Sequence, residues 1–271
     1  MNNHTYPQAT INDNVSVEPT EVNTKINPAE KNTITIKTKT DKTDNKNGNK
    51  LSSTGSACIK PLTQHSGIAL PMLVNNVDTD QIIPSREMKK VSKLGLSDGL
   101  FAGQRYLPSQ KSRSDDTRLV NPEFILNITP FNRASVLLSG KNFGCGSSRE
   151  HAVWAIKEFG FKAIIAESFG SIFRTNCLRN GLLPVVLEAK QIRQLHDQIM
   201  QDPLNNKVSV DVASLTVGSP NGETFSFELE GHFQEMLIGG LDFISLTQKR
   251  KNQIDSFIEQ DKINREWAYL K

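Results

Sequence analysis

Short apolar runs alternate with helical segments between residues 134 and 187, and this pattern restricts the fold more than any other feature. The runs are ASVLLS at 134–139, FKAIIA at 161–166 and LLPVVL at 182–187. Each has the length and apolar character of a buried strand. Strands joined through helices by short connections favour a parallel β/α core.

The segments between these runs carry helix signals. Ala152, Ala155, Ile156 and Phe159 follow i, i+3, i+4, i+7 spacing and form one apolar stripe. Gly160 follows the stripe, at a position where glycine often ends a helix. A second, shorter helix is predicted over 169–180, closed by a glycine.

The flanking segments extend this core on both sides. GIALPMLV at 67–74 predicts one more strand, and a helix is expected over 188–200. Residues 207–211 and 224–229 alternate polar and apolar side chains, and Asn221-Gly222 precedes the second of them as in a hairpin. The remainder, 231–271, is helical in character. The prediction is an α/β fold with a C-terminal hairpin and helices.

The first 64 residues differ from the rest in composition. They are mostly Asn, Thr, Lys, Ser and acidic residues, and Tyr6 is their only aromatic side chain. Such a segment buries too little apolar surface to offset its ordering entropy. The sequence therefore predicts a disordered extension over 1–64 and one folded domain over 65–271.

The same extension has none of the common features of a targeting segment. It lacks the apolar run of a secretory signal, and no run in the chain reaches the roughly 20 apolar residues of a membrane span. The first arginine is Arg86, whereas transit peptides are rich in arginine and poor in acidic residues. We expect a cytoplasmic protein without a membrane partner.

Charge and cysteine content give no sign of a nucleic-acid partner or of a metal site. The net charge is +3, from 32 basic and 29 acidic residues, which gives no field that would attract nucleic acid. The three cysteines are Cys58, Cys145 and Cys177, and no two of them form a CxxC pair. We therefore expect no metal or iron–sulfur site in this chain, and we interpret Cys145 and Cys177 as packing or loop residues.

The segment KNFGCGSSREH at 141–151 joins a predicted strand to a predicted helix. Gly144 and Gly146 allow backbone conformations closed to other residues and a close approach of a ligand. Ser147 and Ser148 are expected to open the helix, where unpaired N–H groups and the helix dipole favour a carboxylate or phosphate. Arg149 adds a planar fork suited to carboxylate.

Local patterns leave other interpretations open. Ser147 and Glu150 have the spacing of a capping box, in which the serine only caps the helix. Gly144-Cys145-Gly146 is similar to the start of a dinucleotide loop, but Arg149 stands where the third glycine belongs. The Lys-Ser/Thr pair of a phosphate-binding loop is missing as well. We interpret His151 as structural.

Four longer segments of the sequence resemble motifs of a known protein family. FGCGSSREHAVWAI at 143–156 and IIAESFGSIFRTNCLRNGLLPV at 164–185 resemble the swivelling domain of the aconitase family. NVDTDQIIP at 76–84 and GLDFI at 240–244 resemble motifs of the isopropylmalate dehydratase small subunits within that family. The resemblance spans about 66–260, with the motifs in order, and implies a swivelling β/β/α domain.

The resemblance also implies roles for individual residues. Ser147 would be the catalytic base, Arg149 the anchor for a substrate carboxylate, and Ser148 a supporting contact. Asp80 matches an acidic residue of the family's active-site cleft, and Arg105 lies where the family has a mobile recognition region. The family's [4Fe–4S] cluster would be held by a large partner subunit and not by this chain.

The implied activity is that of a hydro-lyase in leucine biosynthesis. It would isomerise 2-isopropylmalate and 3-isopropylmalate through isopropylmaleate, and only in a heterodimer with the large subunit. A related dehydratase acting on homoaconitate, citraconate or dimethylmalate is the nearest alternative. A non-catalytic anion-binding module, with Ser147 only a helix cap, is the alternative from another class.

Overall fold

The computed structural model describes residues 59–88, 92–108, 118–146 and 148–269. Most of the predicted extension, as well as Cys58 and Ser147, lies outside the described residues. The packed part of the chain starts before the expected position 65. Leu62 is already buried, and its N–H donates to the carbonyl of Leu237 at 2.8 Å.

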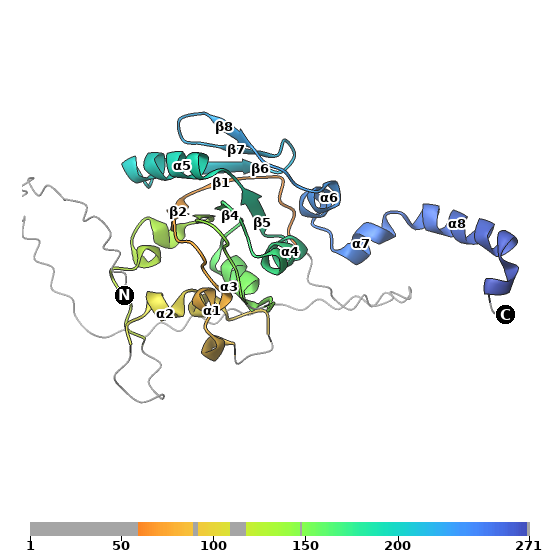
Figure 1. Cartoon of the computed structure of the whole chain (residues 1–271), viewed down its shortest axis with the longest axis horizontal. Helices are drawn as coiled ribbons and strands as arrows, with labels where there is room; N and C mark the ends of the chain where they lie inside the picture. The colour runs from red at the N-terminus through yellow and green to blue at the C-terminus, as the bar shows by residue number, and fades with distance from the viewer. Residues whose placement is uncertain (1–58, 89–91, 109–117, 147, 270–271) are drawn as a thin grey trace, which may run out of the picture. The chain divides into compact units, whose positions relative to one another are not determined.

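A parallel sheet of four strands forms the core, as the alternating pattern predicts (Figure 1). Its strands, in spatial order, are β2 (Ala69–Pro71), β3 (Val136–Leu138), β4 (Ala163–Ala166) and β5 (Leu183–Val186). The helices that follow β3, β4 and β5 are α3 (His151–Phe159), α4 (Ser171–Arg179) and α5 (Ala189–Gln201). The three predicted strands and three helices of this region are confirmed.

The helix α3 ends as predicted but begins later. Ala152, Ala155 and Ile156 of its stripe are buried, and Gly160 has φ 127° and donates to two carbonyls of the last turn. The helix starts only at His151, with Glu150 at the cap position and no side-chain cap bond. The prediction that the helix begins at the two serines is therefore wrong, while the capping-box alternative involves Ser147, which lies outside the described residues.

The strand predicted over 67–74 is divided between two sheets. β1 (Gln64–Gly67) pairs with a strand of the second sheet, whereas β2 belongs to the parallel sheet. The break falls at Ile68, directly after Gly67, where any Cβ would overlap Ser135 Oγ. Glycine therefore allows the chain to pass closely over the start of β3 as it changes sheets.

The second sheet is antiparallel and has the order β1-β6-β7-β8. Its later strands are β6 (Val208–Asp211), β7 (Thr216–Gly218) and β8 (Thr224–Ser226). The hairpin at Asn221-Gly222 is present, with Gly222 at φ 90°. The sequence analysis did not predict β7. In the structure, β6 and β8, the two strands that were predicted, each pair with β7 and not with one another.

In its described residues, the connection from β2 to β3 contains only short helical pieces. These are α1 (Thr79–Ile82), α2 (Ala102–Arg105) and the 3-10 turns η1 (Ser85–Glu87), η2 (Ser97–Gly99), η3 (Ile125–Asn127) and η4 (Phe131–Arg133). Glu158 of α3 fixes this connection by accepting the N–H groups of Gly95, Leu96 and Ser97 at 2.6, 2.6 and 3.0 Å. Burial raises the pKa of Glu158, but these three bonds outweigh it and leave the pKa below its usual value.

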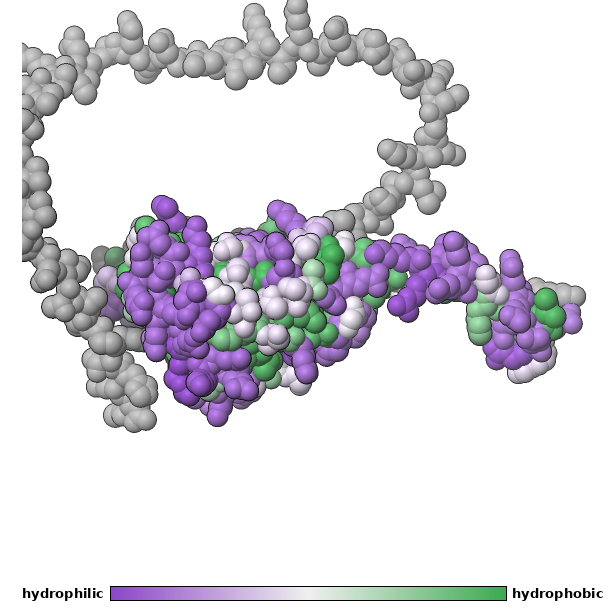
Figure 2. Space-filling model, turned by 90° about the horizontal axis from the view of Figure 1, so that it is seen from above, coloured by the Kyte–Doolittle hydropathy of each residue, from purple (hydrophilic) through white to green (hydrophobic). Residues whose placement is uncertain are grey.

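The C-terminal part is helical, as predicted: α6 (Gly231–Gly239), α7 (Phe243–Gln248), α8 (Lys251–Asn264) and the 3-10 turn η5 (Glu266–Ala268). No residue of α8 is buried, and hydrophilic side chains cover much of the C-terminal helices, with apolar patches between them (Figure 2). Among the helices that the structure describes, none is both long and apolar enough to cross a bilayer.

An ion pair ties α6 to α4. Arg174 donates to both carboxylate oxygens of Glu230 at 2.9 Å, and these bonds lower the pKa of Glu230 to about 2. A lowered carboxyl pKa contributes stability above the ordinary value near 4.5, and this contribution is lost as the pH falls towards 2. Because both side chains are partly exposed, the pair contributes at most about 1 kcal/mol.

We therefore expect Glu230→Gln to lower the free energy of unfolding at about pH 7 but not at about pH 2, where the native carboxylate is itself becoming protonated. Urea unfolding of both proteins across this range measures the difference. A difference that stays constant down to the lowest pH would contradict the role of the pair.

Candidate active site

Three loops meet at the carboxyl edge of the parallel sheet. They follow β2, β3 and β4, and this edge is where open α/β sheets bind ligands. The backbone of the central loop, 139–150, bonds to both neighbours. Asn76 N–H donates to the carbonyl of Lys141 at 2.8 Å, and Phe143 N–H donates to the carbonyl of Ser168 at 3.0 Å.

Polar side chains add further ties between these loops. Asn75 Oδ1 accepts the N–H of Lys141 at 2.7 Å, and Ser168 Oγ accepts the N–H of Asn142 at 2.8 Å. Asn142 Nδ2 also donates to Asn76 Oδ1 at 3.0 Å. Our sequence analysis missed these residues, although polar side chains directly after buried strands are a recognisable signal. The ties hold the central loop in place before any ligand binds.

The glycines of the central loop have different tasks. Gly144 has φ 74°, and a Cβ there would overlap the ring of Phe173, so this glycine is required by packing. Gly146 has φ 94°, and a Cβ there would come no closer than 3.6 Å to Thr79 Oγ1. Both glycines have the positive φ that the sequence predicts, but a Cβ would clash only at Gly144 and would make ordinary van der Waals contacts at Gly146.

The motif residues lie on the exposed side of this loop. Ser147 is outside the described residues, whereas Ser148 and Arg149 are exposed and directly precede α3. The carbonyl of Ser148 accepts a hydrogen bond from Asn176 Nδ2 at 3.2 Å. The polar segment thus approaches the positive end of the α3 dipole, although it is not part of the helix.

Arg149 and Asp80 lie together. Arg149 Nη2 is 3.8 Å from Asp80 Oδ1, and Ser85 Oγ donates to the same oxygen at 2.9 Å. The Arg149 side chain is 46% exposed and that of Asp80 is 63% exposed, so a ligand can reach both. A small hollow beside them is lined by Thr79, Ile83, Met88, Arg149 and Ala152.

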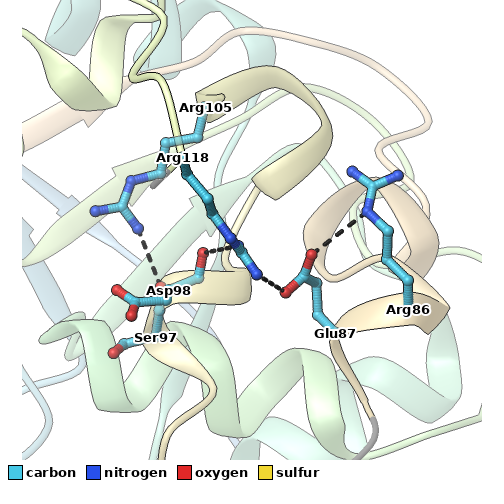
Figure 3. A network of polar contacts seen from close by, with 6 residues as sticks. All are labelled: Arg86, Glu87, Ser97, Asp98, Arg105 and Arg118. Carbon is cyan, nitrogen blue, oxygen red and sulfur yellow. Dashed lines mark hydrogen bonds and ion pairs between the residues drawn. The ribbon is translucent and has the colours of Figure 1, made fainter. Parts of the chain in front are cut away.

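Arg105 lies elsewhere, in a network of structural contacts (Figure 3). Its guanidinium donates to the carbonyl of Ser97 at 3.0 Å and to Asn127 Oδ1 at 3.3 Å, and lies 5.1 Å from the ring centre of Phe159. These contacts join α2 to η2, η3 and α3, and none of them involves Arg149. The structure does not bring Arg105 together with the motif residues.

A second arginine completes this network. Arg118 donates to Glu87 Oε2 at 2.6 Å and to the carbonyl of Asp98 at 3.4 Å, and Glu87 also pairs with Arg86 at 3.4 Å (Figure 3). The bond to Glu87 raises the pKa of Arg118 above its usual value. The network thus stiffens the connection that carries η1, next to Asp80.

The cysteines do not form a metal site among the described residues. Cys177 is fully buried, and burial raises the pKa of its thiol, which disfavours the thiolate that iron requires. Cys145 lies in the central loop, where its carbonyl accepts the N–H of Thr79 at 2.9 Å. No group of three His, Cys, Asp or Glu side chains in the described parts could hold a metal ion. This donor set does not fit an iron–sulfur cluster.

His151 is the first residue of α3, and its ring lies 4.9 Å from that of Trp154. Its Nδ1 is buried and has no hydrogen-bond partner among the described residues. The two rings are tilted by 52°, and the structural role of His151 stays a prediction.

Comparison with known proteins identifies the family. The aconitase C-terminal domain matches residues 59–190. The 3-isopropylmalate dehydratase small subunit of Cupriavidus necator is 51% identical over 212 residues, which cover 78% of this chain and 99% of that protein. The small subunit of the same name from Marinobacter nauticus is 42% identical, over 78% of this chain and 98% of its own length.

A solved structure supports the same assignment. The crystal structure of 3-isopropylmalate dehydratase from Methanocaldococcus jannaschii matches with a TM-score of 0.50 and 28% identity, over 71% of this chain and 98% of that one. The predicted aconitase-type α/β fold is thereby confirmed. With relatives matched over nearly their full length, this chain belongs to the 3-isopropylmalate dehydratase small subunits, a family of aconitase-type hydro-lyases.

Proposed function

We propose that this chain supplies the base and a carboxylate anchor to a cytoplasmic hydro-lyase that interconverts 2-isopropylmalate and 3-isopropylmalate in leucine biosynthesis. The pairing of Arg149 with Asp80 on an exposed edge, within a family of this name, carries the proposal. Arg149 and Asp80 are both exposed and their charged atoms are 3.8 Å apart, so the arginine can exchange this carboxylate for one of the substrate.

Ser147 is the proposed base. As its alkoxide, it takes a proton from carbon while hydroxide leaves the neighbouring carbon and takes up a proton from solvent, so that isopropylmaleate and water form. The reverse addition places the hydroxyl on the other carbon. A serine is a poor base unless its alkoxide is stabilised. The adjacent α3 N-terminus and the guanidinium of Arg149 both favour the anion, and a closed cleft strengthens these effects.

The proposed site is only half complete in this chain. Ser148 and Arg149 are exposed, and no group of three His, Cys, Asp or Glu side chains among the described residues could hold a metal ion. A [4Fe–4S] cluster on the large subunit would supply the Lewis acid that assists the departure of hydroxide. In this proposal Arg149 binds a carboxylate, Ser148 supports it, Asp80 orients the guanidinium, and Arg105 stabilises the connection beside the site.

A substrate comparison tests the proposal. The complex reconstituted with its large subunit is assayed with 2-isopropylmalate, and in parallel with homoaconitate, citraconate and dimethylmalate. We expect kcat/KM to be highest for 2-isopropylmalate. Faster turnover of another diacid would refute the substrate, and the absence of turnover with all four would favour the anion-binding module.

A further inference from the structure

We infer that Asn176 is a positioning residue that aims Arg149 through the peptide bond between Ser148 and Arg149. This inference rests on the proposed function, because it assigns a role in binding the substrate carboxylate. Asn176 lies on α4, and neither our sequence analysis nor the family match singles it out. Its side chain links α4 to the carbonyl of Ser148, while Phe173 of the same helix packs against Phe143 and Gly144.

The geometry of Asn176 is that of an internal anchor. The residue is only 6% exposed, and its Nδ2 donates to the carbonyl of Ser148 at 3.2 Å. The carbonyl of Ser148, the N–H of Arg149 and the Cα of Arg149 belong to one planar peptide unit. A hydrogen bond that fixes the carbonyl therefore also fixes the orientation of this unit. The direction of the arginine side chain therefore depends on a bond made from another helix.

Hydrogen bonds at the C-terminal end of α4 hold the helix that carries Asn176 in place. One turn further along α4, Asn180 Nδ2 donates to the carbonyl of Asn176 at 2.9 Å. Asn180 Oδ1 accepts the indole N–H of Trp154 at 3.0 Å, and the carbonyl of Asn180 accepts a bond from Lys157, so α4 is fastened to α3. Asn180 thus holds the two helices together. Of these two asparagines, only Asn176 donates a hydrogen bond to the carbonyl of Ser148.

This difference makes Asn180 a matched control. Asn176→Asp removes the donor and places an oxygen against the Ser148 carbonyl, while Asn180→Asp makes the same chemical change without touching the motif segment. If Asn176→Asp does not fold, Asn176→Leu removes the donor in a side chain of similar size and no charge. All variants are assayed as assembled complexes, with activity normalised to the amount of complex.

We expect the Asn176 variants to raise the KM for 2-isopropylmalate by about tenfold, because a displaced anchor binds the ground state and the transition state less well. Asn180→Asp should lower the melting temperature but leave KM within about threefold of the parent value. An unchanged KM in both Asn176 variants, or an equal rise in Asn180→Asp, would overturn the inference.

A double-mutant cycle sharpens the test. With Arg149→Lys, the planar fork whose direction Asn176 controls is already lost, so Asn176→Leu should then change KM by less than about threefold. Full additivity of the two effects would also overturn the inference. If the parent complex does not turn over 2-isopropylmalate at all, the proposed function fails instead, and the two failures are distinguishable.

Discussion

Ser147→Ala is expected to reduce turnover by the reconstituted complex by ~10²–10⁴-fold, because it removes the proposed base while the rest of the site stays in place. Assembly with the large subunit should be unchanged, since alanine is close in size to serine and the substitution removes only a hydroxyl. Steady-state kinetics on complex isolated by size-exclusion chromatography measures both quantities. Ser214→Ala, on the turn between β6 and β7, is the matched control and should keep full activity.

The helix-cap hypothesis predicts a different outcome for the same variant. A lost cap costs about 0.5–2 kcal/mol of stability and leaves turnover largely intact. The described structure already disfavours this hypothesis, because α3 begins at His151 and Glu150 occupies the cap position. Near-normal turnover in Ser147→Ala, together with a lower melting temperature, would nevertheless exclude Ser147 as the base.

Arg149→Lys is expected to lower kcat/KM for 2-isopropylmalate by ~10–10²-fold, equivalent to about 1.4–2.7 kcal/mol of lost binding in the transition state. Lysine keeps the charge but cannot offer two parallel N–H groups to a carboxylate. The free energy of unfolding should change little, because the ion pair with Asp80 is exposed and its charged atoms are as far apart as 3.8 Å.

The control for this variant is Arg133→Lys. Arg133 is exposed in η4, before β3, and so lies away from the carboxyl edge of the sheet. Its substitution should leave kcat/KM unchanged. Equal kinetics for Arg149→Lys and the parent complex would show that Arg149 does not bind the reacting diacid.

Much of the fold follows from local patterns in the sequence. The buried strands 134–139, 161–166 and 182–187 and the stripe of α3 were predictable because their apolar spacing directly reflects burial. The division of 67–74 between two sheets was not, because it depends on contact between Gly67 and Ser135, which lie far apart in the chain. Strand β7 has only three residues, too few to show a period.

The candidate site shows the same division. The motif resemblance pointed to Asp80 and Arg149, and the structure brings these two side chains together. Arg105 occurs in a plausible segment, but its partners Ser97 and Phe159 are set by tertiary packing. Asn176 could not be recognised at all, because nothing in its local sequence shows that it faces the carbonyl of Ser148.

The central claim is that this chain holds half of an active site, and mixing the two subunits tests it most directly. Conversion of 2-isopropylmalate is measured with this chain alone, with the large subunit alone, and with both. We predict turnover only in the mixture, rising with added chain until the subunits are equimolar. Full turnover by the large subunit alone, or by this chain alone, would contradict the claim.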